Sequence, residues 1–260
     1  MPLVLKKSVR EKLLAIALVI GINSAQEAQA ADVKVMAVNA VKEAYVELVA
    51  AFEKSSGHTV TTVWGGSESI AKRVSDGEVV DIVFNSAINV DKLILAGKLV
   101  PGSRADFAKS GVGVAVRSGL PKSDISSSDA VKRAVLAAQS VAYSSGPSGF
   151  YVADLFKRMG IADQIKDKDK VRQPASGVQI GELLARGEAD LGFQQVSELL
   201  HVKGIDYLGP LPADIQNITI FSAGLHTAAP APDAARALLQ YLTSPEAGTA
   251  IKKMGMEPGQ

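Results

Sequence analysis

The sequence predicts an α/β fold divided between two lobes, and three observations support this prediction. Short apolar runs of strand length alternate with amphipathic stretches of helical periodicity, which is typical of a sheet covered by helices. The alternation occurs in two series, the second of which starts near Gly111. The 260-residue chain leaves 230 residues after an N-terminal leader, a length that fits two small lobes.

The leader, residues 1–30, has the composition of a secretory signal peptide. Basic residues up to Lys12 precede an apolar run from Leu13 to Ile22, and residues 28–30 form an A-x-A cleavage site. The apolar run is too short to span a bilayer as a helix, and no cysteine follows it that could carry a lipid anchor. The sequence therefore predicts a periplasmic protein without lipid anchor or membrane insertion.

The first series contains three expected strands and three expected helices. Strands are predicted at the apolar runs 33–38 (VKVMAV), 58–64 (HTVTTVW) and 79–86 (VVDIVFNS). Helices are predicted where the periodicity changes, at Val41 to Lys54, Ser69 to Ser75 and Val90 to Ala96.

The second series has the same alternation and then returns to an apolar strand. Strands are predicted at 111–119 (GVGVAVRSG), 140–146 (SVAYSSG), 189–195 (ADLGFQQ) and 217–226 (NITIFSAGLH). Helices are predicted at Tyr151 to Met159, Ile180 to Arg186 and Ala234 to Leu242.

Composition excludes several classes of function. Removing the leader's four basic and two acidic residues leaves 24 basic and 25 acidic residues. We therefore expect no positive electrostatic field that would attract nucleic acid or an anionic membrane. The absence of cysteine excludes disulfides, thiolate metal sites and thiol catalysis. His58, His201 and His226 are far apart in the sequence and lack metal-ligand spacing. We therefore expect neither a metal nor another cofactor.

Small polar residues follow five of the predicted strands. In α/β folds, ligands gather at the carboxyl ends of strands, where loops lead into helix N-termini. Five such loops at equivalent strand ends predict a small-molecule site. The loops are Asn39-Ala40-Val41, Gly65-Gly66-Ser67, Asn85-Ser86-Ala87, residues 144–149 (SSGPSG) and Gln194-Gln195.

Three longer segments resemble the periplasmic solute-binding proteins of the molybdate-binding type. They are residues 65–87 (GGSESIAKRVSDGEVVDIVFNSA), 183–193 (LLARGEADLGF) and 241–258 (YLTSPEAGTAIKKMGMEP). The resemblance implies a two-lobed periplasmic binding protein (type II) fold with a ligand cleft between the lobes. It divides the chain after the leader into lobe 1 (31–114 and 222–260) and lobe 2 (115–221), joined by hinge strands near 111–117 and 218–225.

The departures from this family concern the residues that would hold an oxyanion. Ala40 stands where the molybdate binders offer a serine hydroxyl, whereas a second family serine is retained as Ser67. Glu68 replaces a small residue, and Gln194 or Gln195 replaces the tyrosine after the strand ADLGF. These replacements predict poor binding of molybdate.

In these details the chain is similar to the periplasmic aconitate isomerases, a group of exported enzymes with this fold. The similarity implies that the chain interconverts cis- and trans-aconitate by moving a proton between C4 and C2. Such a reaction needs fixed donors for three carboxylates and one base that removes and returns the proton. It needs no metal, nucleotide or thiol.

Candidate donors and charges follow from the polar loops. For the carboxylates we expect the side chains or backbone N–H groups of Asn39, Ser67, Ser86, Ser145, Ser148, Gly149 and Gln195, with Ala40 lining the site. Arginine pairs with a carboxylate through two parallel hydrogen bonds, and the candidates are Arg73, Arg117 and Arg172. The alternative for each of these arginines is a solvated surface position.

Glu68 is the predicted general base, because closure over a tricarboxylate would raise its pKa toward a useful value. The alternative is a capped helix start, with Ser67 as the cap and Glu68 beside the positive end of the helix dipole. Tyr143 and His58 are rival acid–base groups.

Three functions remain open from the sequence. An isomerase would need only a small-molecule carboxylate as its partner. A binding protein would deliver an oxyanion or organic acid to the permease of an ABC transporter. A periplasmic sensor or adaptor is the third. The fold alone does not distinguish these functions.

Overall fold

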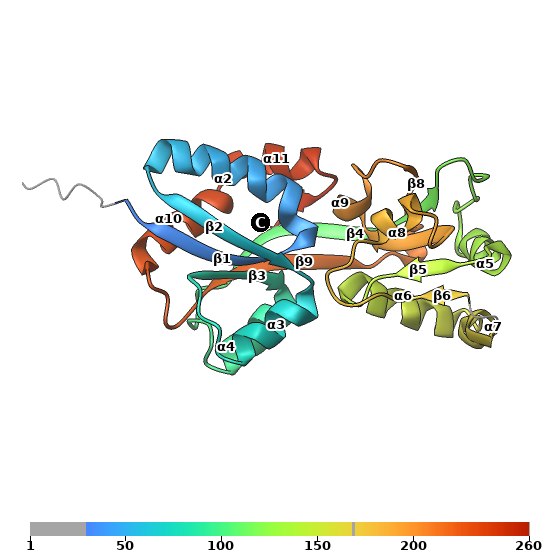
Figure 1. The fold of residues 1–260 in the computed structure, drawn as a ribbon, viewed down its shortest axis with the longest axis horizontal. Helices are drawn as coiled ribbons and strands as arrows, with labels where there is room; N and C mark the ends of the chain where they lie inside the picture. Colours follow the sequence, from blue (N-terminus) through green and yellow to red (C-terminus); the bar gives the residue numbers. More distant parts are fainter. Residues whose placement is uncertain (1–29, 168–169, 260) are drawn as a thin grey trace, which may run out of the picture. The chain divides into compact units, whose positions relative to one another are not determined.

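The computed structural model describes residues 30–167 and 170–259 of the chain. The predicted signal peptide lies outside the described residues except for Ala30. The fold is α/β, with strands in a mixed sheet and helices on its faces (Figure 1).

The first part of the sheet has the strand order β2-β1-β3-β9-β4. Strands β1 (Asp32–Val38), β2 (Thr59–Gly65) and β3 (Ile82–Ser86) are parallel, and β9 (Ile218–Leu225) runs antiparallel between β3 and β4 (Ala105–Arg117). Every residue of β3 is buried, because parallel strands are covered on both faces. The carboxyl ends of β1, β2 and β3 therefore meet at one edge.

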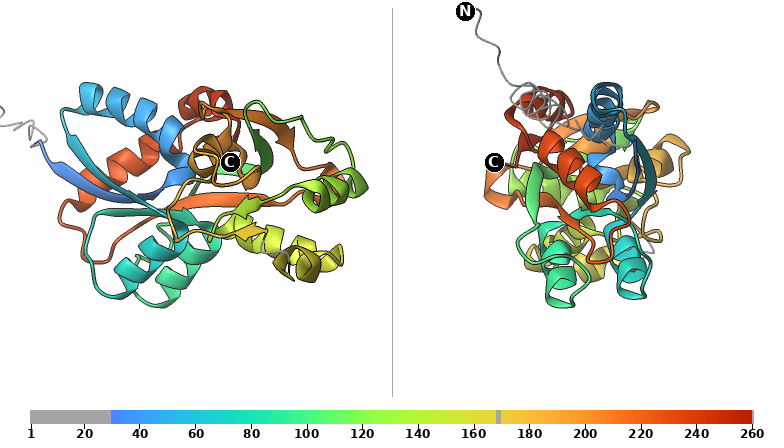
Figure 2. Two further views of the ribbon diagram at one scale, coloured as in Figure 1. Left: turned by 45° about the vertical axis from the view of Figure 1, so that its right-hand side comes forward. Right: turned by 90° about the vertical axis from the view of Figure 1, so that its left-hand side faces the viewer.

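Helices cover both faces of this part. Helices α2 (Lys42–Ser56) and α10 (Pro232–Leu242) pack together on one face with α11 (Gly248–Lys253). Helices α3 (Ser67–Ser75) and α4 (Ala87–Leu95) cover the opposite face (Figures 1 and 2). The short elements nearby are η1 (Asn39–Val41), η3 (Pro245–Ala247) and β10 (Glu257–Pro258). These elements enclose one hydrophobic core.

The second part of the sheet continues from β4 in the order β4-β7-β5-β6. Strand β7 (Leu191–Gln195) is antiparallel to β4. Strand β5 (Val141–Tyr143) pairs with β7 in parallel, and β6 (Val171–Arg172) pairs with β5 in parallel. Strand β8 (Ile205–Pro210) pairs with β4 as well. The helices are α5 (Ser128–Ala137), α6 (Pro147–Arg158), α7 (Ala162–Asp167), α8 (Ile180–Ala185), α9 (Val196–Leu199) and η2 (Ala213–Ile215). Two further apolar clusters form the core of this lobe.

Strand β4 belongs to both lobes. Residues 105–111 pair with β9, and residues 112–116 pair with β7. At the change of partner, Gln216 Oε1 accepts from Val112 N at 2.8 Å and Gln216 Nε2 donates to Val112 O at 3.0 Å. The predicted hinge ranges are therefore strands, although β4 begins six residues earlier than expected. The lobe boundaries after residues 114 and 221 stay predictions.

Several helices begin earlier than their apolar periodicity predicts. Helix α3 starts at Ser67, α4 at Ala87 and α6 at Pro147, because the polar loop residues form the first turns. Helices α5, α7, α9 and α11 and strand β8 are not among the predicted elements. Most of these are too short to show a period of their own.

Hydrogen bonds from side chains to backbone carbonyl groups join the two lobes. Asn39 Nδ2 donates to Gly177 O at 3.0 Å, and Ser197 Oγ donates to Ala40 O at 2.8 Å. Each bond joins the loop after β1 to the other lobe. The structure is therefore that of a closed cleft.

Gly66 forms the tightest approach between the lobes. A Cβ atom at Gly66 would lie 2.3 Å from Ser176 Oγ and 2.4 Å from Gly177 N. The second of these is a backbone atom, so a methyl group there requires the lobes to separate. Gly177 has a φ of +94°, a conformation that glycine adopts readily.

We expect Gly66→Ala to hinder closure without unfolding either lobe, because alanine tolerates the φ of −83° at this position. With a saturating tricarboxylate, the ligand class expected from the sequence, the variant should keep a larger radius of gyration in small-angle scattering than the wild type. Its affinity should fall by at least about tenfold, or 1.4 kcal/mol. Gly248→Ala is the control, because its methyl group would meet no atom nearer than 3.5 Å. Equal compaction and affinity in both variants would contradict the assigned closure contact.

Candidate functional site

A cavity lies where the polar strand ends of the two lobes meet. Its volume is about 40 Å³ in this closed structure, the space of a few water molecules. The lining comes from the ends of β1, β2, β5 and β7 and from residues 176–179. Four of the five polar loops that the sequence singles out therefore converge on it, and the loop after β3 does not.

Six of the expected site residues line this cavity. They are Asn39, Ala40, Ser67, Ser145, Ser148 and Gln195. Gly149 lies just outside the cavity, where a Cβ atom would fall 1.5 Å from Ser144 O. Glycine at this position allows the first turn of α6 to pack directly on the end of β5.

Two helices begin at the cavity without a side-chain cap. The N-cap residues are Gly66 for α3 and Gly146 for α6, and neither provides a side-chain cap. Later in the first turn of α3, Ser69 N donates to Ser176 Oγ at 3.4 Å. Ser67 is the first residue of α3 and not its cap, so the capped-start alternative for Ser67 is wrong in this respect. Uncapped first turns from both lobes present backbone N–H groups and positive dipole ends to one space, which favours an anion.

Serine hydroxyls complete this cradle. Ser145 Oγ is buried and has no hydrogen-bond partner among the described residues. Ser148 is buried, and its Oγ lies 3.1 Å from Ser144 Oγ. A buried hydroxyl without a partner costs about 1–3 kcal/mol, so the Ser145 hydroxyl is suited to a bound ligand.

Two glutamines, Gln194 and Gln195, end strand β7 at the cavity. Gln195 has an amide whose oxygen accepts from Thr219 Oγ1 at 3.0 Å and whose nitrogen donates to Ser110 O and Gly111 O, in the orientation that satisfies both atoms. Gln195 therefore ties the cavity floor to β4 and β9. Gln194 Oε1 accepts from Ile180 N at 2.8 Å.

Glu198 is a cavity residue that our sequence reasoning missed. It lies in α9, directly after β7, and accepts a hydrogen bond from Gln194 Nε2 at 2.9 Å. Part of its residue surface stays exposed, but its carboxyl group is surrounded by protein. Burial raises the pKa of Glu198 to about 7, and hydrogen bonds from Gln179 and Gln194 oppose part of the rise. A glutamate one helical turn beyond a polar strand end was the signal available in the sequence.

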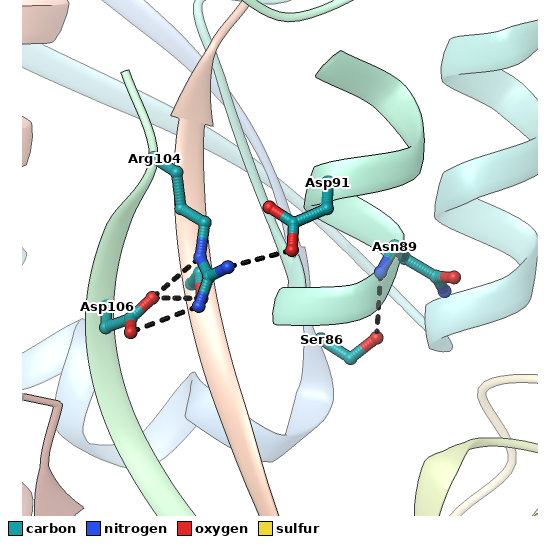
Figure 3. Close-up of polar contacts among 6 residues, drawn as sticks. Ser86, Asn89, Asp91, Arg104 and Asp106 are labelled. Atoms are coloured by element: carbon teal, nitrogen blue, oxygen red, sulfur yellow. Dashed lines mark hydrogen bonds and ion pairs between the residues drawn. The ribbon is translucent and has the colours of Figure 1, made fainter. Parts of the chain in front are cut away.

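Glu68 does not line the cavity. It is exposed in the first turn of α3, where its Oε1 accepts from Asn89 Nδ2 at 3.1 Å. It borders a separate surface pocket with Lys92 and Phe150. Ser86 faces the same pocket, and its Oγ caps α4 by accepting from Asn89 N at 3.4 Å (Figure 3). The cap explains why the loop after β3 is polar.

The three candidate arginines also lie outside the cavity. Arg73 is in the last turn of α3, roughly 9 Å along the axis from the helix start, and forms two hydrogen bonds with Glu78. Arg117 is the last residue of β4 and pairs with Asp190 at 3.4 Å. Arg172, on the outer strand β6, is exposed. The positions of these arginines in the sequence did not predict that their side chains would lie away from the cavity.

The rival acid–base groups are engaged elsewhere. Tyr143 is buried with its ring edge-on to Phe156, and desolvation raises its pKa. His58 Nδ1 accepts from Ala31 N, and its ring stacks on Phe52. Neither residue lines the cavity.

Within residues 30–167 and 170–259, no three His, Asp or Glu side chains gather as metal ligands. No helix in those residues has the length and apolarity to cross a bilayer.

The raised pKa of Glu198 implies a pH-dependent stability. Between about 4.3, the pKa of a free glutamate, and about 7, the native state keeps a proton that the unfolded chain has lost. The group's contribution to the free energy of unfolding is therefore lost as the pH rises through this window. We expect Glu198→Gln to stabilise the ligand-free protein by about 1–3 kcal/mol more at about pH 8 than at about pH 4.5. Urea unfolding at both pH values measures this, and a pH-independent difference would contradict it.

Comparison with known proteins agrees with the geometry. A sequence model of the family described as bacterial extracellular solute-binding protein matches residues 33–257. The chain is 40% identical over 218 residues to an aconitate isomerase of a Pseudomonas species, covering 82% of each protein. It is 27% identical over 256 residues to the molybdate-binding protein of Rhodobacter capsulatus, covering 96% of each.

Solved structures share the fold at lower identity. The periplasmic molybdate-binding protein of Azotobacter vinelandii matches 88% of this chain and 100% of its own with a TM-score of 0.76 at 21% identity. The sulfate-binding protein of Mycobacterium tuberculosis matches 88% of this chain and 87% of its own with a TM-score of 0.70 at 19% identity. With its two-lobed α/β fold, the chain belongs to the family of bacterial extracellular solute-binding proteins.

Proposed function

We propose that the chain is an aconitate isomerase that works in the cleft between its lobes. The observation that carries the proposal is the cavity itself, which combines two uncapped helix starts and an unpartnered serine hydroxyl. These groups suit carboxylates, because charge-assisted hydrogen bonds to backbone N–H groups are strong. The relative that shares 40% of the sequence is an aconitate isomerase, which supports the same substrate class.

The proposed reaction moves one proton within an allylic unit. Asn39, Ser67, Ser145 and Ser148 hold the carboxylates, and the closed lobes exclude water from the carbanion. Holding the substrate in one orientation places C4 and C2 within reach of the same acid–base group. No described side chain of the cavity is cationic, so neutral donors and helix dipoles carry the anion.

The same proposal includes export and the lobe boundaries. The leader at residues 1–30 would be removed, leaving a periplasmic chain that begins near Ala31. Lobe 1 would then comprise 31–114 and 222–260, and lobe 2 would comprise 115–221. Export to the periplasm would let the enzyme meet external carboxylates.

A second function is favoured by the family. Solute-binding proteins hold a ligand in such a cleft, and two relatives are molybdate-binding proteins. Under this alternative, the chain delivers an oxyanion or organic acid to an ABC permease. Ala40 and the internally bonded Gln195 count against molybdate, because neither offers a hydroxyl to a tetrahedral oxyanion.

We expect the purified chain from residue 31 onward to convert trans-aconitate to cis-aconitate catalytically, and the reverse. Chromatography of the two isomers over time measures the conversion, with the protein-free solution as the control. Product in large excess over protein is the expected result. Tight stoichiometric binding without conversion would instead support the transport alternative.

Molybdate should bind weakly in isothermal calorimetry. A lost hydrogen bond to a charged ligand costs about 1.5–3 kcal/mol, which is about a tenfold loss for each 1.4 kcal/mol. The comparison is the affinity of the same preparation for trans-aconitate. Molybdate affinity that exceeds the aconitate affinity would contradict the proposed ligand class.

A further inference from the structure

We propose that Glu198 is the catalytic acid–base group that removes the proton from C4 of aconitate and returns it to C2, an inference that rests on the proposed isomerase function. The position of Glu198 in the cavity carries the proposal. Among the described residues that line the cavity, it is the only one with a carboxyl, imidazole or amino group. A reaction sealed inside this cavity therefore has one candidate for a side chain that shuttles a proton at neutral pH.

The carboxyl group is held in place by a chain of amides. Gln194 Nε2 donates to Glu198 Oε1 at 2.9 Å and lies 3.2 Å from Gln179 Oε1. Gln194 is fixed in turn by the 2.8 Å bond from Ile180 N, at the start of α8. The base is thus oriented by neutral groups that do not compensate its charge.

Charged groups near Glu198 lie in a neighbouring cavity. The two cavities share Asn39, residues 177–179 and Glu198. The charged groups of the second cavity are Lys42 and Glu43 of α2, Glu182 of α8 and His201. No ion pair joins Glu198 to any of these groups in the described structure. Burial thus dominates its raised pKa of about 7, so both protonation states are accessible near neutrality, as a shuttle requires.

The proposed steps balance without any other reactant. The ionised Glu198 takes the proton from the C4 methylene, so that the C–H bond breaks and an O–H bond forms. The electron pair spreads over C4, C3 and C2, next to the carboxylates held by the helix starts. Glu198 then protonates C2, and the double bond moves from C2=C3 to C3=C4. The group ends in the state in which it began.

Glu68, the base expected from the sequence, lacks this placement. It is exposed and borders the surface pocket on the α4 side, so its proton would exchange with water and not stay with the substrate. Glu68 and Glu198 therefore offer two rival locations for the base. Glu68 borders the surface pocket beside α4, and Glu198 lies between the ligand cavity and its neighbour. Substituting each in turn decides between them.

The test compares Glu198→Gln with Glu68→Gln and with Glu188→Gln, a matched control at an exposed glutamate that pairs with Arg186. Glu198→Gln should lower kcat by about 10²–10⁴-fold and change the affinity for trans-aconitate little, because the amide oxygen can still accept from Gln194. The other two variants should retain turnover. Glu198→Asp, which keeps a carboxyl group one methylene shorter, should recover part of the rate lost in Glu198→Gln.

Calorimetry of trans-aconitate binding in buffers of different ionisation heat gives a second readout that does not need turnover. The wild type should take up a fraction of a proton at about pH 7.5, because a bound carboxylate favours protonated Glu198. Glu198→Gln should lose this uptake, and Glu188→Gln should keep it.

The outcomes separate the two proposals. Wild-type protein that binds but does not isomerise overturns the proposed function, and loss of proton uptake in Glu198→Gln then still identifies Glu198 as the titrating group of the cavity. An active wild type with full turnover in Glu198→Gln overturns the role of Glu198 alone. If Glu68→Gln loses turnover while Glu198→Gln keeps full turnover, the base is Glu68 of α3.

Discussion

The change of partner along β4 is the constraint on which the rest of the structure depends. One strand of 13 residues pairs with β9 in its first half and with β7 in its second half. The side chain of Gln216 bonds both backbone groups of Val112 at the change. Because β4 is common to both sheets, the carboxyl ends of β1 and β2 face those of β5 and β7. The polar loops from opposite halves of the sequence thereby line one cavity.

The proposed anion site has no cationic side chain among the described residues that line it. Each uncapped helix start contributes up to about 1 kcal/mol through its dipole, and each hydrogen bond to a charged ligand contributes about 1.5–3 kcal/mol. The summed free energy of several such contributions is similar to that of one buried ion pair, and no arginine has to be desolvated. Burial raises the pKa of the Glu198 carboxyl group in this space to about 7, and no described cationic side chain lines the cavity to lower it.

The sequence could predict the α/β class, the main strands and most cavity loops, because strand periodicity and polar strand ends are local signals. It could not predict side-chain direction. Glu68 and Ser67 are adjacent in sequence, yet Ser67 lines the cavity and Glu68 is exposed, because successive helical residues point about 100° apart. Ser86 has a polar strand-end pattern but serves as a helix cap. Glu198 lies in a four-residue helix too short for any periodic signal, and only the packing of β7 against β4 places it.

The uncapped starts of α3 and α6 have a thermodynamic consequence. Neither Gly66 nor Gly146 provides a side-chain cap for its helix, one helix in each lobe, and Ser176 Oγ accepts from Ser69 N later in the first turn of α3. A bound carboxylate acts as the missing cap for both, so the ligand is in effect a part of the secondary structure it touches. Ligand binding and the ordering of these two helix turns are then thermodynamically linked. Fraying of either helix weakens binding, and binding reduces the fraying of both helices.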